Sequence, residues 1–255
     1  MRSLIKVNLY RLKNDTLFKV MLILCVALNL LSVGMGVMII EMAEQMEMIN
    51  LMITGKSQFI ASLSFASNMG LIIPIMLMIM ASREYKYGLV RNKIIAGYSR
   101  VKIYFAGMIS TLMIGLLVFI INSALSFICS SLVYGYGVTI DANEIGNIAL
   151  IVVLGVVVTS VMYTIAYVCA IWLGSMAFIP YLVLVFGFSI LATVLSIFES
   201  SSTVMFIQKL IPSYQVEVML LSNDIQWGYI VVSSMVYIAL FATFGYFIAK
   251  KKELK

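Results

Sequence analysis

The residue types that most often carry enzyme chemistry are scarce in this sequence. Its 255 residues include no histidine, which removes the commonest general base and the commonest metal ligand. The three cysteines, Cys25, Cys129 and Cys169, lie singly within apolar runs, and no CxxC pair predicts a zinc site or a disulfide framework. We therefore expect no catalytic residue, no metal site and no enzyme activity in this chain.

One short string ends like a nucleotide-binding phosphate loop. It is ITGKS at 53–57, but the first glycine of that pattern would fall at position 50, which is Asn50. The sequence has no second phosphate loop and no soluble region of useful size. If the protein does ATP-driven work, we expect ATP and Mg²⁺ to be bound by a separate subunit and no cofactor to be bound by this chain.

Composition indicates a membrane protein. Hydrophobic residues make up 63% of the chain and charged residues 11%, against roughly 45–50% and about 25% in soluble domains. A soluble protein cannot hide that much apolar surface. A membrane protein also concentrates Lys and Arg on its cytoplasmic side, so the net charge of +6 does not predict nucleic acid as a partner.

Six apolar segments are long enough to cross a bilayer, which takes about 20 helical residues. We expect an all-α integral membrane protein with one transmembrane domain over residues 1–255. The expected spans are 17–40, 59–81, 103–133, 146–173, 177–198 and 227–249. Only Gly174, Ser175 and Met176 separate the fourth span from the fifth.

The distribution of charge predicts the orientation. All of the 17 Lys and Arg residues except Lys56 and Lys209 lie near the termini or in the loops on the same side of the membrane. The other loops hold eight of the 11 acidic residues: Glu41, Glu44, Glu47, Asp141, Glu144, Glu199, Glu217 and Asp224. Because the basic side of a membrane protein is cytoplasmic, both termini are expected there.

Two segments outside the spans have helical patterns of their own. Within 1–13, apolar residues are interleaved with four Lys and Arg residues. This pattern favours an amphipathic helix in the membrane surface, or else a basic flank that only anchors the first span. The outer loop at 199–226 is apolar in its middle and broken by Pro212, which predicts a hairpin of two short helices. The hairpin is either a cap over the outer face or a gate.

The expected spans carry no ionisable residue except Lys19, at an inner boundary. Ion-coupled transporters usually carry intramembrane carboxylates, so this chain shows no energy source of its own within the membrane.

Small residues recur in the second expected span. Ser62, Ala66 and Gly70 are four residues apart, and Asn68 lies on the same span. Such a stripe lets another helix approach closely. It represents either ordinary packing within the chain, or a dimer seam or pathway lining.

The densest charge lies in a basic block at 83–102, REYKYGLVRNKIIAGYSRVK, with six Lys and Arg residues and one acid. Its apolar residues have the spacing of one face of a short helix: Leu89, Val90, Ile94 and Ile95. Gly88 precedes that helix, Gly97 follows it, and Ser99 is placed to cap the third span. We expect a compact helix at the cytoplasmic end, which binds anionic lipid headgroups or docks a partner.

Within this block lies the string E-Y-x-x-G-x-x-R-N-K-x-x-x-G-x-S-R, which begins at Glu84 and ends at Arg100. The string resembles the first cytoplasmic loop of type-2 ABC exporter permeases. More narrowly, it is similar to that loop in small Firmicute-type permeases associated with lantibiotic, bacteriocin and amphipathic-peptide export or immunity. The basic start, the six spans and the outer hairpin resemble the same family.

The resemblance implies a multi-pass protein of a bacterial plasma membrane, whose loop at 83–100 is a coupling helix in a groove of a separate ATPase subunit. The contact residues that it implies are Arg83, Glu84, Tyr85, Gly88, Arg91, Asn92, Lys93, Gly97, Ser99 and Arg100, with a smaller second contact at Gly174 and Ser175. Two ATPases would work with two permeases, the second being another copy of this chain or a paralogue.

The function that we expect is that of the permease subunit of an ATP-driven ABC exporter. Uncharged spans suit an amphipathic or hydrophobic substrate. The first candidate for that substrate is a peptide such as a toxin, a bacteriocin or an antimicrobial peptide. The alternative is a non-transporting membrane protein that senses or sequesters an antimicrobial peptide and confers immunity by binding alone.

Overall fold

The computed structural model describes residues 1–45, 54–63, 71–137, 141–197, 202–215 and 227–252. Within these residues every regular element is helical. Five helices are long and apolar enough to cross a membrane: α2 (Thr16–Gln45), α6 (Arg100–Tyr134), α7 (Ala142–Leu173), α8 (Phe178–Ser196) and α11 (Trp227–Lys251). The chain is therefore an all-α, multi-pass membrane protein, as its composition predicts.

The second expected span, 59–81, is not one continuous helix in the described residues. It is represented by α3 (Gly55–Ser62) and α4 (Ile72–Lys86), and residues 64–70 between them lie outside the described part. Pro74 lies in the first turn of α4, where its missing N–H would have had no partner within the helix. The other five expected spans are confirmed as long helices, whereas the count of six is not.

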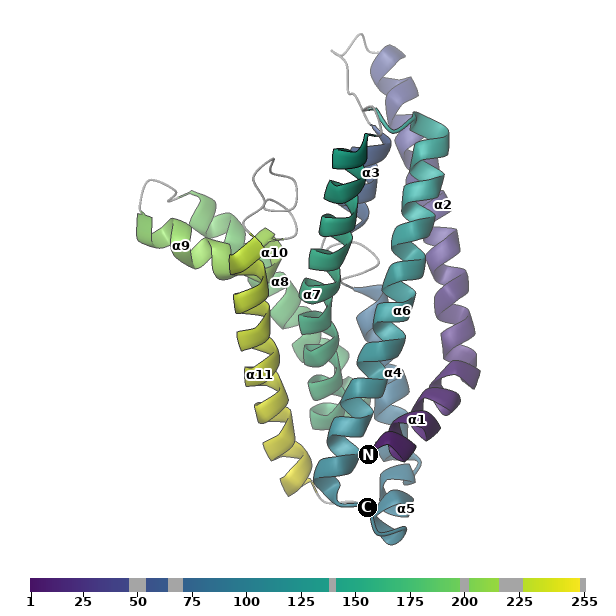
Figure 1. Ribbon diagram of the computed structural model, residues 1–255, viewed down its shortest axis with the longest axis vertical. Helices are drawn as coiled ribbons and strands as arrows, with labels where there is room; N and C mark the ends of the chain where they lie inside the picture. The colour runs from purple at the N-terminus through teal and green to yellow at the C-terminus, as the bar shows by residue number, and fades with distance from the viewer. Residues whose placement is uncertain (46–53, 64–70, 138–140, 198–201, 216–226, 253–255) are drawn as a thin grey trace.

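Helix α7 lies at the centre of the bundle, between α6 and α11 (Figure 1). It packs against α4, α6, α8 and α11, and every side chain from Val161 to Ile171 is buried. The approach of α6 depends on Gly115, where an added Cβ would lie 2.6 Å from Tyr163 Cδ2 and 2.8 Å from Leu77 Cδ1. A glycine at this crossing lets the two backbones come close, as is usual in membrane bundles.

A buried polar pair joins α2 to α6 inside the apolar region. Asn29 Nδ2 donates to Asn122 Oδ1 and to the carbonyl of Cys25, each at 2.7 Å. Both asparagine side chains are buried. Hydrogen bonds of this kind stabilise helix association in a bilayer by about 0.6–2 kcal/mol. The hydropathy pattern does not reveal the pair, because each asparagine is a single polar residue within an apolar run.

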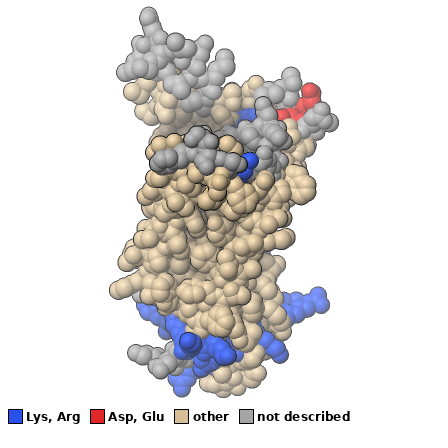
Figure 2. All heavy atoms as spheres, turned by 90° about the vertical axis from the view of Figure 1, so that its left-hand side faces the viewer, with Lys and Arg blue, Asp and Glu red and all other residues tan. Residues whose placement is uncertain are grey.

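The two ends of the molecule differ in charge. Figure 2 shows Lys and Arg gathered at one end and a broad uncharged band above it. We call this the basic end; it carries α1 (Arg2–Asn14), α5 (Leu89–Ile95) and the last turn of α11. The expected N-terminal helix is confirmed as α1, which buries Leu4, Asn8 and Leu12 and packs against α6.

The opposite end carries α9 (Ser202–Leu210) and the single turn α10 (Pro212–Tyr214), whereas residues 216–226 of the expected hairpin lie outside the described part. Pro212 is the first residue of α10, so the chain breaks where the sequence predicts. Ser213 Oγ donates to the Phe188 carbonyl at 3.0 Å, and Gln215 Nε2 donates to Ser233 Oγ at 2.6 Å. These two hydrogen bonds fix α10 and the residue after it to α8 and α11.

Candidate partner-docking site at the basic end

The basic block folds into the end of α4, the short helix α5 and the start of α6. Gly88 and Gly97 flank α5 with φ of +67° and +87°, a backbone conformation that glycine adopts without steric cost. Ser99 accepts a hydrogen bond from the Lys102 N–H at 3.4 Å and caps α6. The short helix, its flanking glycines and its serine cap are thus confirmed.

One face of α5 packs into the protein. Val90 is buried and Ile94 half-buried, and the two contact a small cluster that includes Leu4 of α1 and Ile103 of α6. Ile95 is 75% exposed, so its expected place on the same apolar face is wrong. Val90 and Ile94 are four residues apart and therefore lie on the same face of the helix, whereas Ile95, the residue after Ile94, points about 100° away from it.

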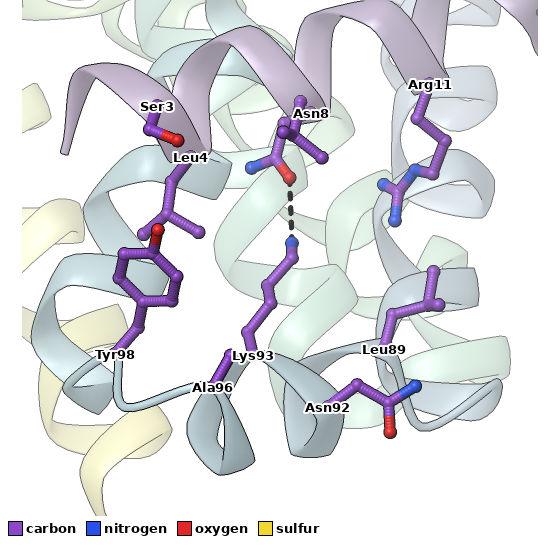
Figure 3. Close-up of a pocket in the computed structure, with 10 residues that line it drawn as sticks. Ser3, Leu4, Asn8, Arg11, Leu89, Asn92, Lys93, Ala96 and Tyr98 are labelled. Carbon is purple, nitrogen blue, oxygen red and sulfur yellow. Dashed lines mark hydrogen bonds between the residues drawn. The ribbon is translucent and has the colours of Figure 1, made fainter.

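Beneath α5, a buried carboxylate holds three helices together. Glu84 of α4 is only 5% exposed and accepts charged hydrogen bonds from Arg11 of α1 and, at 3.3 Å, from Lys93 Nζ of α5. Lys93 Nζ also donates to Asn8 Oδ1 of α1 at 2.8 Å (Figure 3). The structure therefore uses Glu84 and Lys93 inside the protein, although the family resemblance implies contact with another subunit.

Burial and the Glu84 carboxylate act in opposite directions on the pKa of Lys93. Burial disfavours the ammonium and lowers the pKa of Lys93 below its ordinary value, while the nearby Glu84 carboxylate acts in the opposite direction. The ion pair with Glu84 thus offsets part of the free-energy cost of removing the Lys93 ammonium from water.

The end of α11 and the residue after it are bound to the same end. Arg100 Nη1 donates to the carbonyls of Lys250 and Lys252 at 3.1 and 3.3 Å. The Lys252 ammonium lies 5.2 Å from the ring centre of Tyr85 and donates to the Ile171 carbonyl. Arg100 and Tyr85, two of the implied contact residues, therefore hold the end of α11.

Other residues of the block face outward. Arg91, Asn92, Gly97 and Ser99 are exposed, and Ile95 projects beside them. Arg91 and Ile95 are four residues apart and share one face of α5. Arg91 forms no ion pair with any residue in the described part of the chain. This exposed face is the part of the block that is free to meet a partner.

A groove of about 300 Å³ separates α1 from α5 (Figure 3). Leu4, Val7 and Leu89 give it apolar walls, and Arg11 and Lys93 line it as well. Arg11 of α1 and Lys93 of α5 both bind Glu84, so the two helices are held together and the groove is the gap between them.

The two implied contact regions border one cleft. Arg83 and Gly174 both line a space of about 370 Å³ between α4 and the turn that leads into α8. Arg83 Nη1 also lies 3.3 Å from Asp15 Oδ1. Ser175 belongs to the 3-10 turn Gly174–Met176.

The small-residue stripe is described only at its first member. Ser62 ends α3 and donates to the Phe59 carbonyl at 2.6 Å. Ala66, Asn68 and Gly70 lie outside the described residues.

The end of the ITGKS string has a structural role away from the basic end. The Gly55 N–H donates to the Gly135 carbonyl at 2.8 Å, and Lys56 Nζ lies 2.7 Å from Glu144 Oε1. These contacts join the start of α3 to the region where α6 ends and α7 begins. Across the described ranges, no group of three or more Cys, Asp and Glu is arranged to hold a metal ion.

The chain matches no protein-family model, and neither a curated protein nor a solved structure matches it. Its class, an all-helical protein with five helices able to span a membrane, follows from the structure itself.

Proposed function

We propose that the chain is the membrane-spanning permease subunit of an ATP-driven ABC exporter, and that α5 is its docking helix for a separate ATPase subunit. The observation that carries the proposal is the form of α5. It is a seven-residue helix between two left-handed glycines, anchored on one face and free on the other.

The anchored face makes α5 suitable for transmitting force. Val90 and Ile94 pack against α1 and α6, while the Glu84 carboxylate joins α5 to α1 and α4. Helices α4 and α6 in turn pack on the central α7. A displacement of α5 would therefore reach the helices of the bundle directly, without a flexible linker.

The free face has the chemistry of a protein interface. Arg91 supplies a cation without an ion-pair partner in the described residues, and Ile95 supplies an exposed apolar anchor. Arginine and buried apolar anchors are typical of the centres of protein interfaces. Because α5 lies at the tip of the basic end (Figure 1), a partner outside the bilayer could reach it.

The proposal includes the other parts of the transport unit. ATP and Mg²⁺ would bind to the ATPase subunits, and a second permease, identical or paralogous, would complete the pathway. The uncharged band between the two ends favours an amphipathic or hydrophobic cargo, with a peptide as the first candidate.

Co-purification of the full chain from its native membrane tests this proposal. We expect an ATPase with a phosphate loop to be recovered, and Arg91→Glu with Ile95→Asp to lower that recovery at least tenfold, which corresponds to about 1.4 kcal/mol. Both side chains are exposed, so the thermal unfolding of the variant should match that of the wild type.

The matched control is Lys13→Glu with Tyr10→Asp, which makes the same total charge change at two exposed residues of α1. It should leave ATPase recovery unchanged. If no ATPase is recovered with the wild type, or if both variants lose it equally, α5 is not an ATPase-docking helix, and the peptide-binding immunity protein becomes the better hypothesis.

A further inference from the structure

The cleft between α4 and the start of α8 has one polar end and one apolar end. Its polar end is lined by Ser82, Arg83 and Lys86. Its apolar part is lined by Ile75, Met78, Ile79 and Phe178. Its volume of about 370 Å³ is in the range of small-molecule sites.

The polar end carries an excess of positive charge. Arg83 gives one contact to Asp15, at 3.3 Å, and Lys86 is exposed and makes no ion pair within the described ranges. None of the residues that line the cleft is acidic. The cleft therefore favours an anion at this end.

The position of the cleft matches a membrane boundary. Lys86 belongs to the basic end, whereas Ile79 and Ile75 lie about two and about three turns further into the apolar part of α4. Trp172 is half-exposed just before Gly174, and Trp is enriched at the level of lipid headgroups. A molecule in the cleft would thus have its polar part among the headgroups and its apolar part among the acyl chains.

We propose that this cleft is a binding site for an anionic phospholipid of the surrounding leaflet. The headgroup phosphate lies between Arg83 and Lys86, and an acyl chain runs along Ile79 and Phe178. The lipid then bridges α4 and the start of α8 at the basic end. This inference does not rest on the proposed transport function, because it needs only the cleft, its charge and its depth.

The apolar lining separates a phospholipid from a free phosphate. Inorganic phosphate would meet the same two cations but would leave the apolar part of the cleft empty. A zwitterionic lipid would fill the apolar part but would offer its phosphate together with a cation. Only an anionic lipid satisfies both ends.

Thermal unfolding of the detergent-purified full chain tests the proposal with three additives: dihexanoyl phosphatidylglycerol, dihexanoyl phosphatidylcholine and inorganic phosphate. We expect the first to raise the unfolding temperature in a saturable way, since a ligand that binds the folded state stabilises it. The other two, at the same concentration, should have little effect. An equal effect of phosphate, or of both lipids, would overturn the assignment.

Variants locate the effect. Lys86→Glu should raise the apparent Kd for phosphatidylglycerol about tenfold, because it reverses a charge beside the phosphate. Lys19→Glu makes the same charge change at an exposed residue of α2 outside the cleft, and should leave the Kd unchanged. Loss of binding in both variants would mean diffuse attraction to the basic end, and loss in neither would mean that the cleft is not the site.

Discussion

At the residue scale, Glu84 explains how α5 is held. Its carboxylate is buried and is shared by Arg11 and Lys93, which lie on two other helices. Sequence reasoning selected Glu84 and Lys93 for a different reason, as members of a family string. The Arg11 partner could not be predicted, because it is 73 positions away in the chain and only the packing of α1 brings it close.

Glu84→Gln keeps the shape of this side chain and removes its charge. We expect a loss of about 1–3 kcal/mol in stability, because Lys93 and Arg11 then lose their carboxylate in a partly buried site. The measurement is thermal unfolding in detergent, together with the rate of proteolysis within α1, which should rise as that helix loosens.

A double-mutant cycle with Lys93→Gln isolates the pair. The combined variant should lose clearly less stability than the sum of the two single variants. Additive losses, or a loss below about 0.5 kcal/mol for Glu84→Gln, would show that the network does not hold α5.

At the element scale, the features with local signals were the predictable ones. Gly88, Gly97 and Ser99 mark the limits of α5 and α6 within a few residues, and Pro212 marks the break between α9 and α10. Helix–helix contacts were not predictable in this way. The sequence does not reveal that Gly115 lies against Tyr163, since an almost uniformly apolar helix has no pattern that distinguishes one buried face from another.

Gly115→Ala tests the close approach of α6 to α7. An added methyl would lie 2.6 Å from the buried Tyr163 ring, so we expect a loss of about 1–3 kcal/mol from overpacking. The matched control is Gly187→Ala on α8, where an added Cβ meets nothing within 4 Å. There the change should be neutral or stabilising by up to about 1 kcal/mol, because alanine favours a helix over glycine. Equal unfolding temperatures for the two variants would contradict this packing.

At the scale of the whole molecule, composition and charge predicted the class of protein, and five of the expected spans are long helices. Hydropathy over 59–81 predicted one further helix, whereas the described residues form α3 and α4. A hydropathy window measures length and apolar content but not continuity. The local signals were Thr54 and Ser57, which form a capping box at the start of α3, and Pro74 near the start of α4.

The proposed arrangement, with six crossings and both termini in the cytoplasm, predicts that the two flanks of this segment lie on opposite sides of the membrane. Ser57→Cys, at the start of α3, should react with a membrane-impermeant thiol reagent on intact cells. Tyr87→Cys, just after α4, should react only after the membrane is opened. The wild type is the background control for the native cysteines: Cys25 and Cys169 are buried, and Cys129 of α6 is half-buried. Labelling of both variants from the same side would contradict a crossing between them.

The most direct test of the account is photo-crosslinking from the exposed face of α5 in native membranes. A photoreactive residue placed at Ile95 of the full chain should form an adduct with a soluble ATPase that carries a phosphate loop. The control is Tyr10 of α1, which is also 75% exposed at the basic end. It should not give that adduct. An adduct at both positions, or no adduct with any ATPase at Ile95, would contradict the proposal that α5 is the docking helix for the ATPase subunit.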